Sequence, residues 1–362
     1  MIPLLNIDYS KIPELPELKW NIIPKKKYNT TFLQDLKDYY KSDEIEDDNR
    51  YDALEDKSFY EKQLDRFPCN NVFKYLFGTY FIDYIFIDKI QEEIQYYCKL
   101  NDNITIYSKD ETFDSLEVVW YLFNLINQIS KIKVNKNHQI HLVPIDIEKK
   151  LRNDGKFTYN NINSGVCFNH NTIVIWRKEE ISKVLCHEMV HMLKMDYIKD
   201  TRHINNLAEK LFLINKQSET IVNEATTECL TVYIISHLNS YFIKNKTVDE
   251  NHIRKLLEFE MKWTCKQMKK IWKYLISHDI SFETDIISYF FIKGLLLFRL
   301  LNYDDLHQYL FHQIEQFSNT ELNSKMIRQY ILNLDFLDNF GKYFSKVEED
   351  NTDSLRMTYC SK

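Results

Sequence analysis

The residues best suited to chemistry in this chain are His187, Glu188 and His191, which form the pattern H-E-x-x-H. On an α-helix, residues four apart share a face, so both imidazoles could bind one divalent ion, most simply zinc. The intervening glutamate could then accept a proton from a water molecule beside the metal. The pattern predicts metal-assisted hydrolysis. By chance alone it arises in roughly one in fifty such chains, so the prediction requires a third ligand.

Glu224 is the best candidate for that ligand, because catalytic zinc sites take three protein ligands and leave one position for water. Glu228 follows one helical turn later and could hold an imidazole N–H in place. Two other residues compete for the third position. Asp196 faces away from the histidines and could bind only if the helix ended before it, and His203 could reach the metal after a turn.

The two segments that carry these residues are predicted to be amphipathic helices, with the candidate ligands along the edge of each hydrophobic face. Packing of the two faces would bring the ligands together at the border of the core. Lys183 and Lys194 lie roughly opposite the first hydrophobic face. The first face comprises Ile181, Val184, Leu185, Met189, Met192 and Met195, and the second comprises Ile221, Ala225, Cys229, Val232 and Ile235.

Together the motifs resemble those of the gluzincin metalloproteases of the thermolysin type, in which H-E-x-x-H is followed by N-E-x-x-[ST]-[DE]. Residues 223–228 of this chain read NEATTE. The interval between the motifs is longer than in thermolysin, so an additional element is expected there. Residues 172–196 are also similar to predicted metallopeptidases encoded by large DNA viruses. The resemblance implies a Zn²⁺ site with ligands His187, His191 and Glu224, the general base Glu188, and Glu228 supporting an imidazole.

The same resemblance implies where a peptide would bind. In gluzincins an antiparallel edge strand pairs with the substrate backbone, with an Asn-small pair among the contacts. Here Asn163-Ser164 precede a predicted hairpin of strands 165–168 and 172–176. A tyrosine or histidine downstream stabilises the oxyanion in the family, and the sequence leaves four candidates open. They are Tyr197, His203, Tyr233 and His237.

Composition narrows the other function classes. The net charge of −6 gives no general attraction to nucleic acid, and lysines 266, 269, 270 and 273 are expected to form a solvated helix face. Seven scattered cysteines without a C-x-x-C pattern indicate free thiols in a reducing compartment. The first residues lack a secretory pattern, and the longest apolar run, 286–298, contains Lys293 and is too short to span a bilayer. We expect a soluble intracellular protein that acts on a polypeptide.

The predicted fold is α+β and predominantly α-helical. Its zincin-like core would combine a small mixed or antiparallel sheet with the active-site helix pair, and a C-terminal helical domain would follow. A strand is expected near 139–147 and helices at 71–100, 113–131, 249–278, 283–301, 303–317 and 321–345. The expected organisation is an extended acidic arm (1–57), a helical region (58–110), the catalytic core (111–240) and the C-terminal helical domain (241–362).

Three functions fit these observations. The favoured one is a zinc endopeptidase, and the second is another zinc hydrolase, such as an aminopeptidase or a peptidase that acts on one dedicated partner. The third is a non-catalytic zinc protein, for example a structural virion component, whose site would be closed by a fourth ligand or by the 1–57 arm. That arm could equally be an autoinhibitory segment.

Overall fold

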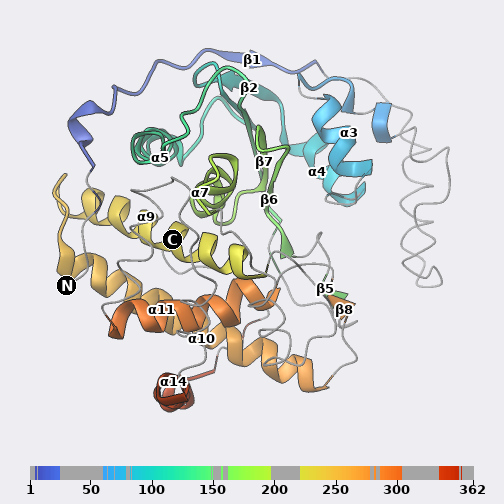
Figure 1. The fold of residues 1–362 in the computed structure, drawn as a ribbon. Coiled ribbons are helices and arrows are strands. Elements are labelled where there is room, and N and C mark those ends of the chain that lie inside the picture. The colour runs from blue at the N-terminus through green and yellow to red at the C-terminus, as the bar shows by residue number, and fades with distance from the viewer. Residues whose placement is uncertain are drawn as a thin grey trace.

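The computed structural model shows a mixed α/β protein with a small mixed sheet and many helices (Figure 1). The structure does not describe residues 304–317 of the expected helix at 303–317 or the first part of the expected helix at 321–345. Tyr197 and His203 also lie outside the described residues. The structure describes residues 5, 7–24, 60–62, 64–68, 70–78, 82, 84–147, 149, 156–157, 162–196, 221–277, 281–282, 286–303, 334–349 and 352.

A six-stranded sheet with the order β1-β2-β3-β4-β7-β6 forms the centre of the molecule. Strands β3, β4 and β7 are parallel neighbours, and the remaining pairs are antiparallel. Strands β5 (Lys156–Phe157) and β8 (Ser281–Phe282) form a separate parallel pair. The strands of the main sheet are β1 (Trp20–Ile22), β2 (Tyr96–Lys99), β3 (Ile104–Ser108), β4 (Gln139–Ile145), β6 (Gly165–Phe168) and β7 (Thr172–Arg177).

Helices cover both faces of this sheet. Helices α3 (Asn70–Gly78) and α4 (Tyr84–Glu93) lie on one face, and α5 (Leu116–Ile129) and α7 (Ile181–Met192) lie on the other (Figure 1). Side chains alternate between the faces of a strand. On β7, Ile173 and Ile175 belong to the core around α7, whereas Val174 and Trp176 belong to the core around α3 and α4. The sheet therefore separates two cores, and α7 lies inside the larger one.

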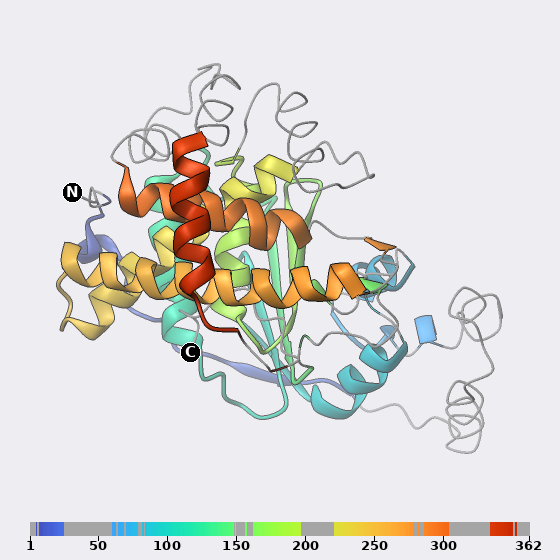
Figure 2. The same ribbon diagram turned by 90° about the horizontal axis from the view of Figure 1, so that it is seen from below.

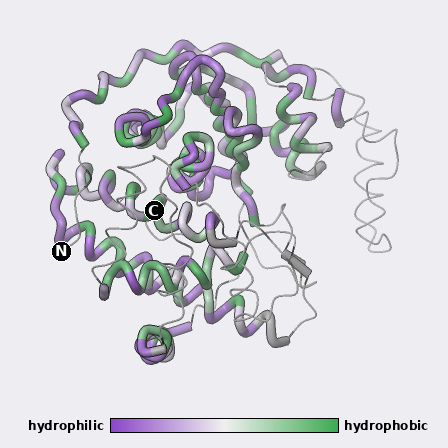
Figure 3. Tube along the Cα trace, in the orientation of Figure 1, coloured by the Kyte–Doolittle hydropathy of each residue, from purple (hydrophilic) through white to green (hydrophobic). Residues whose placement is uncertain are grey.

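Further helices pack outside α7 and enclose it. These are α9 (Ile221–Ile243), α10 (Glu250–Ser277), a π-helical segment (Ser288–Ile292) that continues into α11 (Lys293–Asn302), and α14 (Leu334–Lys346). Figure 2 shows α14 crossing α10 and α11. The central helices alternate hydrophobic and hydrophilic residues along their length (Figure 3). One continuous core joins residues from both sides of the expected boundary at 240, which itself falls within α9.

The strand near 139–147, the hairpin of β6 and β7, and the helices near 113–131 and 249–278 are confirmed. The expectation of helix throughout 71–100 was wrong, because α4 ends at Glu93 and β2 follows. The side chain of Asn101 explains the reversal into β3: its Oδ1 accepts hydrogen bonds from the backbone N–H groups of Asn103 and Ile104, at 2.9 and 2.8 Å. This turn reverses the direction of the chain, so that β2 and β3 pair as antiparallel neighbours.

The described part of the N-terminal arm packs along the side of the fold. Strand β1 pairs with β2, Tyr9 stacks on Tyr241 of α9, and Trp120 of α5 donates a hydrogen bond to the carbonyl of Pro13. Residues 7–24 thus contact α5, the second half of α9 and the sheet edge. Among the described helices, none combines the length and hydropathy that crossing a lipid bilayer requires.

Candidate metal centre

Helix α7 carries the H-E-x-x-H residues at the centre of the fold. It begins after Glu180, whose φ of 60° places the backbone in the left-handed region, and it ends near Lys194, whose φ is 52°. The sheet and α5 cover one side of α7, and α9 covers another. Nearly every side chain of α7 is therefore buried, including His187 and Glu188.

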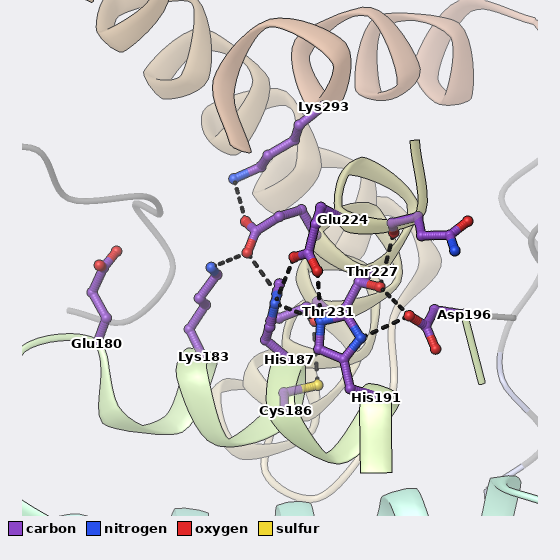
Figure 4. Close-up of polar contacts among 12 residues, drawn as sticks. Glu180, Lys183, Cys186, His187, His191, Asp196, Glu224, Thr227, Thr231 and Lys293 are labelled. Carbon is purple, nitrogen blue, oxygen red and sulfur yellow. Dashed lines mark hydrogen bonds and ion pairs between the residues drawn. The ribbon is translucent and has the colours of Figure 1, made fainter. Parts of the chain in front are cut away.

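The three predicted ligands converge on one point (Figure 4). The Nε2 atoms of His187 and His191 are 3.0 Å apart, and each lies 3.3 Å from a carboxylate oxygen of Glu224. Zinc bonds to nitrogen and oxygen are about 2.0–2.2 Å long, so two ligands at tetrahedral positions lie about 3.3 Å apart. The two nitrogens contact different oxygens of Glu224, and one ligand atom from each of the three residues lies within 4.8 Å of the others, which is close enough for all three to bind one ion. Glu224 therefore lies where the third ligand of a zinc ion would be, although it comes from a separate helix, α9.

Two further carboxylates fix the orientation of the imidazoles. His187 Nδ1 lies 2.8 Å from Glu228 Oε1, and His191 Nδ1 lies 2.7 Å from Asp196 Oδ2. Ionised carboxylates only accept hydrogen bonds, so these contacts favour the tautomer that carries its proton on Nδ1. In the neutral rings both Nε2 atoms then present lone pairs toward each other and toward Glu224. Electron-rich atoms at this spacing require a positive charge between them, which a bound metal ion or a proton on an imidazole would supply.

The pKa shifts of His191 and Glu224 also reflect the need for positive charge at this point. Burial alone would lower the pKa of His191, but Glu224 and Asp196 raise it well above the ordinary value, so that protons take the place of a cation. Burial would raise the pKa of Glu224, but His191 and His187 lower it overall. The Glu224 carboxylate is therefore ionised and available as a ligand.

Glu188 differs from the other carboxylates of the site. Its side chain lies next to the ligands in sequence but is not one of the three converging groups. Burial raises its pKa above the usual value for a glutamate, and the neighbouring imidazoles only partly oppose this. A carboxylate with a raised pKa binds a proton more readily near neutral pH, as a general base must.

Asp196 has a role that sequence reasoning did not assign. It was considered as a rival metal ligand, but its carboxylate instead contacts Nδ1 of His191 and accepts a hydrogen bond from Thr227 Oγ1 at 3.1 Å. The helix ends at Met192, and the left-handed backbone at Lys194 turns the chain back so that Asp196 reaches the ring. The helix break that the sequence left open does occur, and it places Asp196 against the ring of His191.

Two of the four candidates for the oxyanion donor lie far from the candidate ligands. Tyr233 and His237 are nine and thirteen residues beyond Glu224 on α9, about 13 and 20 Å along the helix axis. His237 is buried against the arm, where its Nε2 accepts a hydrogen bond from the backbone N–H of Leu5, so neither residue is at the site. The sequence left these candidates open because it gives no distance between them and the candidate ligands. Tyr197 and His203 lie outside the described residues.

The Asn163-Ser164 pair lies immediately before β6, as expected. Its backbone, however, faces the end of β7. The carbonyl of Ser164 accepts a hydrogen bond from the N–H of Trp176 at 2.9 Å, and that of Asn163 accepts one from Arg177 Nε at 3.0 Å. The side chain of Ser164 is buried. Ser164 is therefore closed to a ligand, and half-buried Asn163 remains the candidate of the two.

Sequence reasoning missed three residues that contact this cluster from the surrounding structure. The ring of Tyr289, on the π-helical segment, lies edge-on to His187 with centroids 6.2 Å apart. Lys183 and Lys293 both contact the carboxylate of Glu228. Lys183 had been placed opposite the hydrophobic face of α7, and it is buried because α9 covers that side. Lys293 could not be predicted from sequence, because about a hundred residues separate it from the H-E-x-x-H motif.

Replacing Asp196 with asparagine tests the role assigned to it. Asparagine keeps the size of the side chain but removes the charge that accepts the Nδ1 proton of His191. We expect the zinc dissociation constant to rise by about 10- to 100-fold, the usual effect of losing a carboxylate that supports a metal-binding histidine. Competition with a chromogenic chelator measures this, and Asp338→Asn, in an exposed ion pair of α14, is the matched control. An unchanged affinity would contradict the assignment.

Comparisons of this chain with family models, with curated proteins and with solved structures found no match. The chemistry of the site is therefore inferred from its own geometry.

Proposed function

We propose that this protein is a zinc-dependent peptidase that hydrolyses peptide bonds. The observation that carries the proposal is the convergence of His187, His191 and Glu224, whose ligand atoms all lie within 4.8 Å of one another. In addition, each Nδ1 atom lies within 2.8 Å of a carboxylate oxygen. A set of two histidines and one glutamate is typical of hydrolytic zinc sites. The arrangement of α7 between the sheet and α9 agrees with a zincin-like core of the gluzincin type.

Each residue then has a defined role. His187, His191 and Glu224 would hold the zinc, which when bound acts as a Lewis acid and lowers the pKa of a water molecule to about 7. Glu188 accepts a proton from the attacking water and delivers it to the leaving amine. Glu228 and Asp196 keep the imidazoles in the tautomer whose Nε2 faces the metal.

The position of β6 supports a peptide as the substrate. Within the described sheet β6 is an edge strand, and it lies directly against α7, where a Cβ atom on Gly165 would approach Val184 to 2.6 Å. In the turn that follows β6, His170 Nδ1 lies 3.2 Å from the backbone carbonyl of His191, so this hairpin borders the candidate ligands. An extended peptide that paired with β6 would pass the zinc site.

Metal removal tests the proposal. The purified protein should contain one equivalent of zinc by mass spectrometry and should cleave internally quenched, N-terminally blocked peptides. A zinc chelator should abolish cleavage, and added Zn²⁺ should restore it, because three ligands and one water position give a reversible catalytic site.

The same assay separates the alternatives. Cleavage of peptides with a free amino terminus alone would identify an aminopeptidase instead of an endopeptidase. A protein that binds zinc and cleaves neither a peptide library nor denatured protein would support the non-catalytic alternative and contradict the peptidase proposal.

A further inference from the structure

Two buried lysines hold Glu228, the carboxylate that contacts His187 Nδ1. Lys183 forms an ion pair with Glu228 Oε1, and Lys293 lies 3.5 Å from Oε2 (Figure 4). Lys293 also pairs with Glu260 of α10 at 2.8 Å. The side chains of all four residues are at most 2 % exposed. The four charged residues therefore link four helices: Lys183 is on α7, Glu228 on α9, Lys293 on α11 and Glu260 on α10.

The origin of Lys293 makes this contact unusual. It is the first residue of α11, directly after the π-helical segment Ser288–Ile292. A π-helical turn alters the helical register and is often found at functional sites. Here Tyr289, four residues earlier, faces His187, while Lys293 faces Glu228. The segment therefore directs two side chains from the C-terminal helices toward the same histidine and its partner.

The charge balance of the centre explains why lysines are needed. Four carboxylates, those of Glu188, Glu224, Glu228 and Asp196, surround the two imidazoles in the protein interior. One divalent ion compensates two of these charges. Burial of the remaining negative charge without partners would be costly, and Lys183 and Lys293 supply two positive charges next to Glu228.

A purely structural role is the alternative. Buried ion pairs often contribute little to stability, because desolvation of both charges offsets their attraction, and apolar replacement of a whole pair is often tolerated. Stability alone therefore does not account for two lysines on one carboxylate. Their common contact is the group that orients a metal ligand.

We propose that Lys183 and Lys293 are positioning residues of the metal centre: they fix Glu228 as the acceptor for the Nδ1 proton of His187, which leaves Nε2 free for zinc. Helices α11 and α10 then support the metal centre, because they carry Lys293 and its partner Glu260. This inference rests on the zinc site of the proposed function, but it concerns metal binding and does not depend on hydrolysis.

The double variant Lys293→Met/Glu260→Met tests the inference. It removes an ion pair as a unit, so neither partner is left buried alone, and methionine fills a similar volume. We expect the metal-free variant to melt close to the wild-type temperature. We also expect its zinc dissociation constant to rise about tenfold, the lower end of the effect of residues that support a metal ligand. The visible absorption bands of the Co²⁺-loaded protein should shift, because the ligand field at His187 changes.

Lys149→Met/Glu180→Met is the matched control. This pair is equally buried, its charged atoms are 3.0 Å apart, and it lies at the beginning of α7. The ion pair between these two residues does not include Glu228, so zinc affinity and the Co²⁺ spectrum should change much less than in the test variant. A control that weakened zinc binding as much as the test variant would show a general effect of core disruption and would overturn the inference.

Two other results decide the matter. A folded Lys293→Met/Glu260→Met protein with wild-type zinc affinity and an unchanged Co²⁺ spectrum overturns the proposal. If that variant does not fold, Lys183→Met and ¹⁵N NMR of the zinc-loaded wild type provide the test. The NMR spectrum should show the His187 proton on Nδ1, and a proton-free Nδ1 overturns the proposal. Absence of peptide cleavage in the wild type would contradict only the proposed function.

Discussion

Glu188→Gln should abolish peptide hydrolysis while the protein retains its zinc. Glutamine has the shape of glutamate but cannot accept the proton of the attacking water, and general acid–base catalysis of this kind contributes about 10²- to 10⁴-fold to rate. We expect kcat to fall on the order of 10³-fold with little change in KM. Steady-state assays on a quenched peptide, with zinc content measured on the same sample, check this.

The stability of this variant gives a second, independent result. Burial raises the pKa of Glu188, so folding favours its protonated form and the ionised form opposes folding above the raised pKa. Neutral glutamine removes that opposition, and the melting temperature near neutral pH should equal or exceed that of wild type. Glu117→Gln, an exposed position on α5, controls for the substitution itself. Near-wild-type kcat in Glu188→Gln would remove Glu188 from the mechanism.

Glu224→Ala should lose zinc and activity together. Alanine leaves only His187 and His191, which lie on one helix and cannot complete the three-ligand set. We expect the zinc dissociation constant to rise by more than about 100-fold, beyond the effect of losing a supporting carboxylate. Mass spectrometry of the bound metal and chelator competition measure it.

Glu258→Ala is the control for Glu224→Ala, because Glu258 is an exposed glutamate of α10 paired only on the surface with Arg254. It should bind zinc like wild type. If the Glu224→Ala protein bound zinc at full occupancy and with unchanged affinity, another residue would have to be the third ligand. His203 would then become the first candidate, since Asp196 contacts Nδ1 of His191.

The candidate ligands could be predicted from sequence because helical periodicity relates residues that are close along the chain. The histidines four residues apart and the one-turn spacing of Glu224 and Glu228 fix shared helix faces without knowledge of the fold. The alternation of strands β4 and β7 and the hairpin turn were equally local signals. The structure contains the helices and strands that these local signals predicted.

Features set by long-range packing could not be predicted in the same way. Amphipathicity predicted that Lys183 lies away from the core, but α9 covers that side of α7. The strands at 96–108 follow an aromatic-rich helical segment, and only the Asn101 turn marks the change. Tyr289 and Lys293 reach the centre through a π-helical segment whose register no periodic pattern indicates. Each error involves a partner more than forty residues away or a local break in periodicity.

The burial of α7 has a consequence for synthesis of the protein on the ribosome. When residue 192 has just been added, α7 has neither α9 nor the π-helical segment beside it, and Glu224, Lys293 and Glu260 do not yet exist. At roughly 5–20 residues per second, several seconds of translation separate the histidine pair from its last partners. A nascent chain therefore carries the H-E-x-x-H residues without a complete set of ligands. The proposed centre would therefore become complete only after most of the polypeptide has emerged and folded.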